Sequence, residues 1–259
     1  MFCSVGDEIK FFNTSNHEIV GTAFLKEIEK KEDGGYRLTV DRKVYKVLSQ
    51  ETSNTPTSMY NLDSANKGNI IKSTFKNSRR HAYIIRSACS IVENNIMENN
   101  SGAALEAANE IHGTSNEGLV PSALTFRNNT VSGEGISSKY VPLKIYSWNA
   151  QLGEQACIDG VLIENNTIDV PSMYGSININ SVTGLYMLNN TIKADKPLNE
   201  ATQPVVISNS SIKMIDGLNF DYKQNVSAVI NIVACDVDEN NIKNINIIGE
   251  NIAIPYSIK

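Results

Sequence analysis

The residues of this chain that could carry acid–base chemistry gather in one short interval. Glu106, Glu110, His112 and Glu117 all lie between two copies of an internal repeat. Carboxylates and a histidine in one segment can act as general acid and base, or can hydrogen-bond sugar hydroxyls. No spacing here is diagnostic, and a solvated loop with ordinary charges would look the same. We expect all four residues on one inserted loop. Glu106 and Glu110 are the catalytic candidates, whereas His112 and Glu117 would bind substrate.

Two arginines form a second candidate group. Arg79 and Arg80, followed by His81, open the segment that precedes this interval. They could contact a substrate hydroxyl, or they could cap a strand end and pair with nearby glutamates. We retain Arg79 and Arg80 as substrate-binding candidates.

The single tryptophan gives a third candidate. Trp148 lies in the longest interval between repeats, six residues before Glu154. An indole ring can stack on a sugar ring, and it can equally seal a loop against the core. The sequence leaves both roles open for Trp148, with Glu154 as a possible polar neighbour.

Composition excludes several classes of partner. A net charge of −5 and a pI near 5.3 give no general attraction to nucleic acid. No run of residues is long and apolar enough to span a membrane. The three histidines are too scattered for a metal cluster, and no motif indicates a cofactor. The four cysteines have no CxxC spacing, which favours small buried core residues over a disulfide or a reactive thiol.

A repeat organises most of the chain and decides its fold. A short apolar run, an Asn-Asn pair and a β-branched residue recur at 161–168, 124–131 and 185–192, with shorter echoes elsewhere. When the second position of each pair is aligned, the copies fall at 74, 95, 129, 166, 190, 210 and 241. The short intervals fit one coil of a parallel β-helix, and the longer ones fit a coil with a loop insertion.

The same repeat predicts the details of each coil. Alternate strand residues should point inward and stack, with Phe126, Ile163 and Met187 in one column. A second column should contain Val131, Ile168 and Ile192. Asparagine suits the bend because it tolerates the left-handed conformation and its amide can hydrogen-bond along a ladder. Leucine-rich repeats would need a recurring LxxLxL pattern, which is absent. The sequence predicts an all-β fold, a right-handed parallel β-helix.

Residues 1–55 lack the repeat. Short alternating segments separated by polar turns indicate a small antiparallel, barrel-like module there. We therefore expect two domains, residues 1–55 and residues 56–259. The N-terminus has no basic segment followed by an apolar core, so we expect no signal peptide and anticipate further sequence upstream.

The order of these segments resembles the catalytic β-helix of family 110 glycoside hydrolases, exo-acting α-1,3-galactosidases of bacteria. The resemblance rests on the segments 78–85, 91–95, 101–105 and 124–131, and on a Gly-Asp-Glu strand at 6–8. It implies inverting hydrolysis, in which one carboxyl group protonates the glycosidic oxygen and another activates water. It also implies an extracellular or periplasmic location and an oligosaccharide or polysaccharide partner.

The chain departs from that family in two respects. The family's acidic pair lies upstream of the barrel-like insertion, so no residue here inherits it. Where members place an acidic residue and a tryptophan-containing loop, this chain has residues 107–113, without tryptophan. Two hypotheses follow. The first is a glycoside hydrolase or part of one, and the second is a non-catalytic, polysaccharide-binding or tailspike-like structural β-helix.

Overall fold

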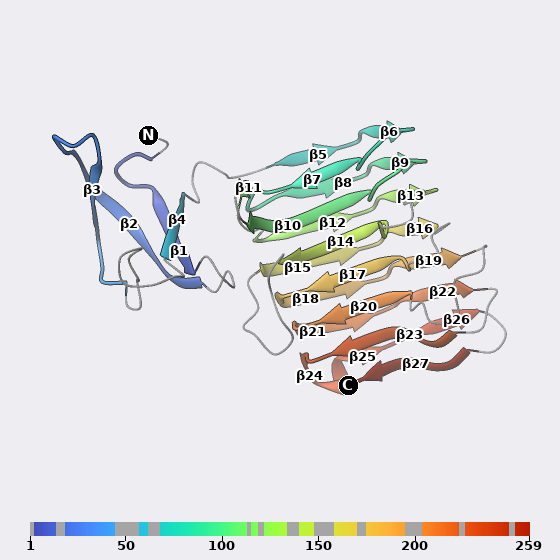
Figure 1. Cartoon of the computed structure of the whole chain (residues 1–259). Helices are drawn as coiled ribbons and strands as arrows, with labels where there is room; N and C mark the ends of the chain where they lie inside the picture. The colour runs from blue at the N-terminus through green and yellow to red at the C-terminus, as the bar shows by residue number, and fades with distance from the viewer. Residues whose placement is uncertain are drawn as a thin grey trace.

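The computed structural model describes residues 3–13, 19–44, 57–61, 68–112, 115–118, 122–133, 140–147, 158–169, 175–194, 204–222, 226–248 and 252–259. Most of these residues lie in strands, as expected from the sequence. Three parallel sheets run through residues 69–258, and a separate antiparallel sheet precedes them (Figure 1). The prediction of a parallel β-helix with an antiparallel module is confirmed.

Each of the three sheets is built mainly from one parallel strand per coil. We name them sheets I, II and III in the order in which the chain visits them within a coil. Sheet I contains β5 (Asn69–Ile71), β8 (Ile91–Glu93), β12 (Leu124–Arg127), β15 (Ile158–Glu164), β18 (Val182–Leu188), β21 (Ser211–Asp216), β24 (Asp236–Val237) and β25 (Ile242–Lys243). Sheet II contains β6 (Thr74–Lys76), β9 (Ile96–Glu98), β13 (Thr130–Ser132), β16 (Thr167–Asp169), β19 (Thr191–Ala194), β22 (Asn219–Tyr222) and β26 (Asn246–Ile248). Sheet III contains β7 (Tyr83–Ile85), β10 (Leu105–His112), β11 (Ser115–Gly118), β14 (Leu143–Ser147), β17 (Ile177–Asn180), β20 (Val205–Ser208), β23 (Val226–Val233) and β27 (Ile252–Ile258). A short 3₁₀ helix, η1 (Glu239–Asn241), separates β24 from β25. The exceptions to one parallel strand per coil are β11, which pairs antiparallel with β10, and β24 and β25, which both pair with β21.

The core consists of the stacked inward columns that the repeat predicted. Phe126 pairs in register with Ile163, which pairs with Met187, and all three are fully buried. Val131, Ile168 and Ile192 form an equally buried column on sheet II. Both predicted columns are confirmed. They are continuous because parallel strands in register place like positions directly above one another.

At the turn between sheets I and II, the two asparagines of each pair have different structural roles. The first adopts the left-handed conformation, with φ near 54° at Asn165 and 53° at Asn189. The second points inward and is buried, forming a ladder of Asn95, Asn129, Asn166 and Asn190. In Asn166 the amide donates to Phe126 O at 2.9 Å and to Asn190 Oδ1 at 2.9 Å. Its own Oδ1 accepts from Asn129 N at 2.9 Å. The predicted amide ladder is confirmed.

The alignment of the outer repeats was wrong. In the first coil the residue equivalent to the second asparagine of the pair is Ser73, not residue 74. Ser73 N donates to Asn95 Oδ1, as the backbone N of each ladder asparagine does to the next asparagine. Asn209 has φ 51° but lies between sheets III and I, after β20, so the pair 209–210 belongs to a different turn. In the coils that follow Asn190, the residue with positive φ at the turn between sheets I and II is Gly217 and then Asn244. The pair 240–241 lies in η1. Similar asparagine-containing turns occur between sheets I and II and between sheets III and I. The sequence pattern alone did not distinguish the two kinds of turn.

The cysteines do not follow the prediction of burial. Cys89 is exposed at a turn with φ 52°, and Cys3 and Cys235 are partly exposed. All three are free thiols, and Cys157 lies outside the described residues. Cys235 Sγ donates to Val233 O at 3.3 Å, and burial raises the pKa of its thiol.

The antiparallel sheet has the strand order β3-β2-β1-β4, formed by β1 (Glu8–Asn13), β2 (Ile19–Lys30), β3 (Tyr36–Val40) and β4 (Thr57–Asn61). Strand β1 is buried on both sides. Ile9 and Phe11 pack into the module's own core, whereas Phe12 joins the core of the β-helix. Lys10 Nζ donates to Ser122 Oγ at 3.4 Å, and burial lowers the pKa of Lys10. The boundary at residue 55 stays a prediction, although β4 extends the antiparallel sheet to Asn61.

The two asparagines of one pair should respond differently to the same substitution. We expect Asn165→Gly to change the free energy of unfolding by less than about 1 kcal/mol, because glycine also adopts positive φ. We expect Asn166→Gly to lower it by about 3 kcal/mol, since several buried hydrogen bonds lose a partner. Denaturant unfolding of both variants measures the difference. Equal losses would contradict this division of roles.

Candidate functional site

The candidate site lies on the outer face of sheet III, where β7, β10 and β14 pair side by side. Leu105 and Ala107 of β10 point inward and are fully buried. By strand alternation Glu106 points outward, yet it is only 6% exposed. It pairs in register with Ile84 on one side and with Lys144 on the other. A buried carboxylate on an outer sheet face needs partners to offset its lost hydration.

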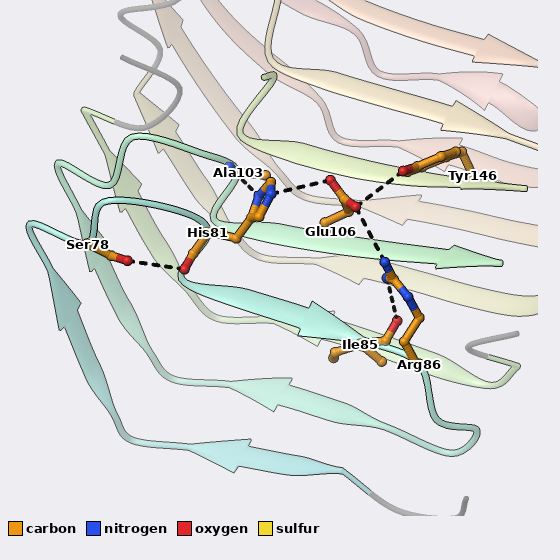
Figure 2. A network of polar contacts seen from close by, with 7 residues as sticks. All are labelled: Ser78, His81, Ile85, Arg86, Ala103, Glu106 and Tyr146. Carbon is orange, nitrogen blue, oxygen red and sulfur yellow. Dashed lines mark hydrogen bonds and ion pairs between the residues drawn. The ribbon is translucent and has the colours of Figure 1, made fainter. Parts of the chain in front are cut away.

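Three side chains supply those partners, as Figure 2 shows. Tyr146 Oη donates to Glu106 Oε1 at 3.2 Å, and Arg86 Nη2 lies 3.5 Å from the same oxygen. His81 Nε2 lies 3.6 Å from Glu106 Oε2. The side chains of Glu106, His81 and Arg86 are 8%, 7% and 12% exposed. We call these four residues the Glu106 cluster. Its three donors use up to three of the roughly four acceptor positions of a carboxylate.

The backbone fixes the tautomer of His81. Ala103 N donates to Nδ1 at 2.9 Å, so that nitrogen carries no proton and Nε2–H faces Glu106. Burial lowers the pKa of His81, Glu106 opposes this, and Arg80, Lys144 and Arg86 lower it further. The imidazole is therefore neutral near pH 7. Gly102 makes the approach possible, since a Cβ there would lie 2.8 Å from both His81 N and His81 Nδ1.

Aromatic rings and cations border the cluster. Lys144 Nζ lies 4.0 Å from the centroid of the Tyr146 ring, a cation–π contact that also orients the phenol. The Tyr140 ring meets His81 edge to face, with ring centroids 4.7 Å apart. Arg80 is exposed beside this group. The arrangement can accept hydrogen bonds at Glu106 and donate them from Lys144 and Arg80, which suits neutral hydroxylated ligands.

The structure brings only some of the predicted residues together. Glu106 and Glu110 both belong to β10, so the expectation of a single inserted loop was wrong for this pair. His112 ends β10 and pairs with Ser115 of β11, the strand that includes Glu117. The structure describes only the backbone of Glu110, His112 and Glu117. A long strand formed here because residues 105–109 pair in parallel with β14.

Arg79 and Arg80 are exposed before β7, and their substrate-binding role stays a prediction. From this part of the chain His81 and Arg86 contact Glu106. Trp148 and Glu154 lie outside the described residues. Their proposed roles stay predictions.

Sequence reasoning missed Arg86, Lys144 and Tyr146. The signal that could have found them is the alternating pattern of the third strand, an apolar residue at positions 143 and 145, 177 and 179, and 205 and 207. Aligning that pattern with 105 and 107 places Lys144 beside Glu106. The Asn-Asn turn marks only the junction of sheets I and II and so carries no information on sheet III.

Two general features of the described residues add context. Within those residues, no group of three potential metal-ligating His, Cys, Asp or Glu side chains was found. No helix in the described part of the chain is long and apolar enough to cross a membrane.

Comparison with known proteins gives one distant similarity. No family model matches the chain. The chain is 25% identical over 213 residues to a protein named alpha-1,3-galactosidase B from Phocaeicola vulgatus. The match covers 73% of this chain and 34% of that protein, so the chain spans about a third of its relative's length. A distant relationship to a carbohydrate-active enzyme is therefore supported.

The neutral state of His81 gives a testable pH dependence. Its pKa in the folded protein is below the ordinary value of 6.5, so the unfolded chain binds more protons in acid. Stability should be greatest above about pH 6.5 and should fall as the pH decreases toward the folded-state pKa. His81→Asn keeps an acceptor for Ala103 N but cannot titrate. Urea unfolding measured between pH 7.5 and pH 5 should show a smaller loss of unfolding free energy in this variant than in the wild type. An identical loss in both proteins would contradict the assignment.

Proposed function

We propose that this chain is a carbohydrate-active β-helix protein that acts on terminal α-1,3-linked galactose, with the Glu106 cluster as part of its sugar site. The observation that carries the proposal is a carboxylate held on an outer sheet face by Arg86, Tyr146 and His81. The distant similarity to an alpha-1,3-galactosidase supports the choice of sugar. An extracellular or periplasmic location is part of the same proposal.

Glu106 is suited to receive a proton or a hydrogen bond rather than to donate one. Arg86 Nη2 lies 3.5 Å from Glu106 Oε1, and the Tyr146 hydroxyl donates a hydrogen bond to the same oxygen. One acceptor position remains for a sugar hydroxyl or for the water that attacks in an inverting reaction. Arg80 and Lys144 would then contact other hydroxyls of the ring. In this proposal Glu106 is the general base or the principal sugar acceptor.

An inverting reaction also needs a carboxylic acid roughly 6.5–9.5 Å from the base. Glu110 is our candidate. It lies four residues further along the same strand, β10. Four residues of strand span about 13 Å of backbone.

Sugar binding without hydrolysis is the second candidate. It is favoured by a specific observation: every described contact of Glu106 is with a cation, a histidine or a phenol. A carboxylate in such surroundings orients a ligand without needing an acid partner. In both cases the partner is an oligosaccharide or polysaccharide.

A galactose-release assay on α-1,3-linked galactobiose, combined with calorimetric binding, separates the two functions. We expect Glu106→Gln to reduce turnover at least about 100-fold if Glu106 is the base, and sugar affinity about tenfold if it only binds. Glu110→Gln should abolish turnover with little effect on affinity if Glu110 is the acid.

Glu93→Gln is the matched control. Glu93 pairs with Arg127 at 3.0 Å on the outer face of sheet I, away from the cluster. Circular dichroism must first show that each variant is folded. A Glu106→Gln variant that binds and cleaves like the Glu93→Gln variant would overturn the proposal.

A further inference from the structure

The outer face of sheet I carries an apolar column. On five neighbouring strands, paired in register, this column contains Ile91, Thr125, Leu162, Tyr186 and Met214. All five side chains are accessible to solvent, and Tyr186 is the most exposed, at 42%. Four of the five are large and apolar. We call this column the apolar strip.

The middle outward columns of the other two sheets are more polar. On sheet II the column contains Ile96, Thr130, Thr167, Thr191, Asn219 and Asn246. On sheet III it contains Ile84, Glu106, Lys144, Asn178, Val206, Asn231 and Ser257. In both columns the apolar residues are isolated by polar ones, whereas Leu162, Tyr186 and Met214 of the apolar strip are consecutive. A contiguous exposed apolar surface is typical of a protein–protein contact.

A charged column flanks the apolar strip on sheet I. On successive strands it contains Glu93, Arg127, Glu164, Leu188, Asp216 and Lys243. Taken from the two ends toward the middle, the column matches a glutamate with a lysine and then an arginine with an aspartate. The innermost match is a glutamate with a leucine. The column is therefore complementary in charge to its own reversed order.

A two-fold axis that runs along the strands, between β15 and β18, would bring this column against its own reversed order. Such an axis places sheet I of a second copy face to face with the first, with the strands parallel and the coils in reversed order. Face-to-face sheets commonly keep their strands within about 30° of each other, as this arrangement does. Arg127 then faces Asp216 of the second copy, and Glu93 faces its Lys243.

The apolar strip occupies the centre of the same arrangement. Leu162 and Tyr186 lie on the two strands beside the axis, so each faces the other residue of the second copy. Met214 follows on the next strand. Burial of these side chains provides the attraction, and the flanking charges favour one register over others.

The size of the face suits a dimer that dissociates. The strands β8, β12, β15, β18, β21 and β25 are stacked one above another (Figure 1). At about 4.8 Å per strand they cover about 29 Å, and strands of about five residues are about 17 Å long. Two copies would together bury on the order of 1,000 Å², which is near the lower limit for a specific interface. We therefore expect a dissociation constant in the micromolar range.

We propose that the outer face of sheet I is a self-association surface, at which two copies of this chain form a symmetric dimer with parallel strands and reversed coil order. The apolar strip forms the centre of this interface, and the flanking charged column sets its register. The inference does not depend on the proposed sugar site, because the Glu106 cluster lies on sheet III.

Sedimentation equilibrium of the whole chain across the micromolar range measures the association. The wild type should show a reversible monomer–dimer equilibrium. Tyr186→Ser should raise the dissociation constant about 100-fold, because an apolar ring is lost at two symmetric places. Ile96→Ser is the matched control, since Ile96 is 44% exposed on sheet II, and its dissociation constant should equal that of the wild type. Circular dichroism first establishes that each variant is folded.

Mixing two charge variants tests the register. Arg127→Glu and Asp216→Arg each place like charges opposite one another at two symmetric positions, so each variant alone should dimerise at least about tenfold more weakly. An equimolar mixture should dimerise with nearly the affinity of the wild type, because both positions then join opposite charges. Each chain keeps its own internal contacts in the mixture, so the recovery cannot come from repair of the fold.

The outcomes that contradict the proposal are specific. A wild type that stays monomeric across the micromolar range overturns it. So does a Tyr186→Ser variant that dimerises as tightly as Ile96→Ser. A mixture that dimerises no better than its two components overturns the register and the symmetric dimer with it. None of these results bears on galactose release or sugar affinity, which test the proposed function separately.

Discussion

The structure depends on the hydrogen bonds of the buried asparagine ladder at the turn between sheets I and II. A parallel β-helix must turn its backbone sharply in every coil, and each turn leaves inward peptide groups that water cannot reach. The amides of Asn95, Asn129, Asn166 and Asn190 satisfy these groups and link each coil to the next. The preceding asparagine of each pair provides the left-handed bend. The two requirements together explain why Asn-Asn recurs.

Because the ladder fixes coil on coil, every position in one strand lies directly over its equivalent in the next. The Glu106 cluster is a consequence of that register. Its members come from β10, from β14 and from the residues that flank β7, so they are brought together only by coil stacking. Tyr146 follows the inward-facing Ile145 and contacts a carboxylate 40 residues earlier in the chain. Burial then makes the cluster chemically distinctive, because it lowers the pKa of His81, whose Nε2 faces the Glu106 carboxyl group.

The same register extends each outward column along the length of the molecule. Charged side chains recur in one outward column of sheet I and in one of sheet II, where the pairs Arg127–Glu93 and Lys76–Glu98 form. The neighbouring column of sheet II contains uncharged side chains such as Thr130, Thr167 and Thr191. Amides, a hydroxyl and an aliphatic side chain occupy sheet III beyond Lys144. In a repeat fold, the residues at one strand position of successive coils together form an extended surface.

The amino-acid sequence by itself determined the fold class. The recurring alternation of apolar residues indicates the strands, and the recurring Asn-Asn pair indicates the turns between them. It identified Glu106 as a candidate, and it predicted the inward columns of Phe126 and Val131 correctly. Only the tertiary structure decided the partners of Glu106 and the true place of the pair 209–210. The reason is that contacts between coils depend on register across 22 to 40 residues, as in the bonds of Ala103 to His81 and of Tyr146 to Glu106. Insertions of variable length hide that register from a linear reading, whereas hydrogen bonds between stacked strands fix it.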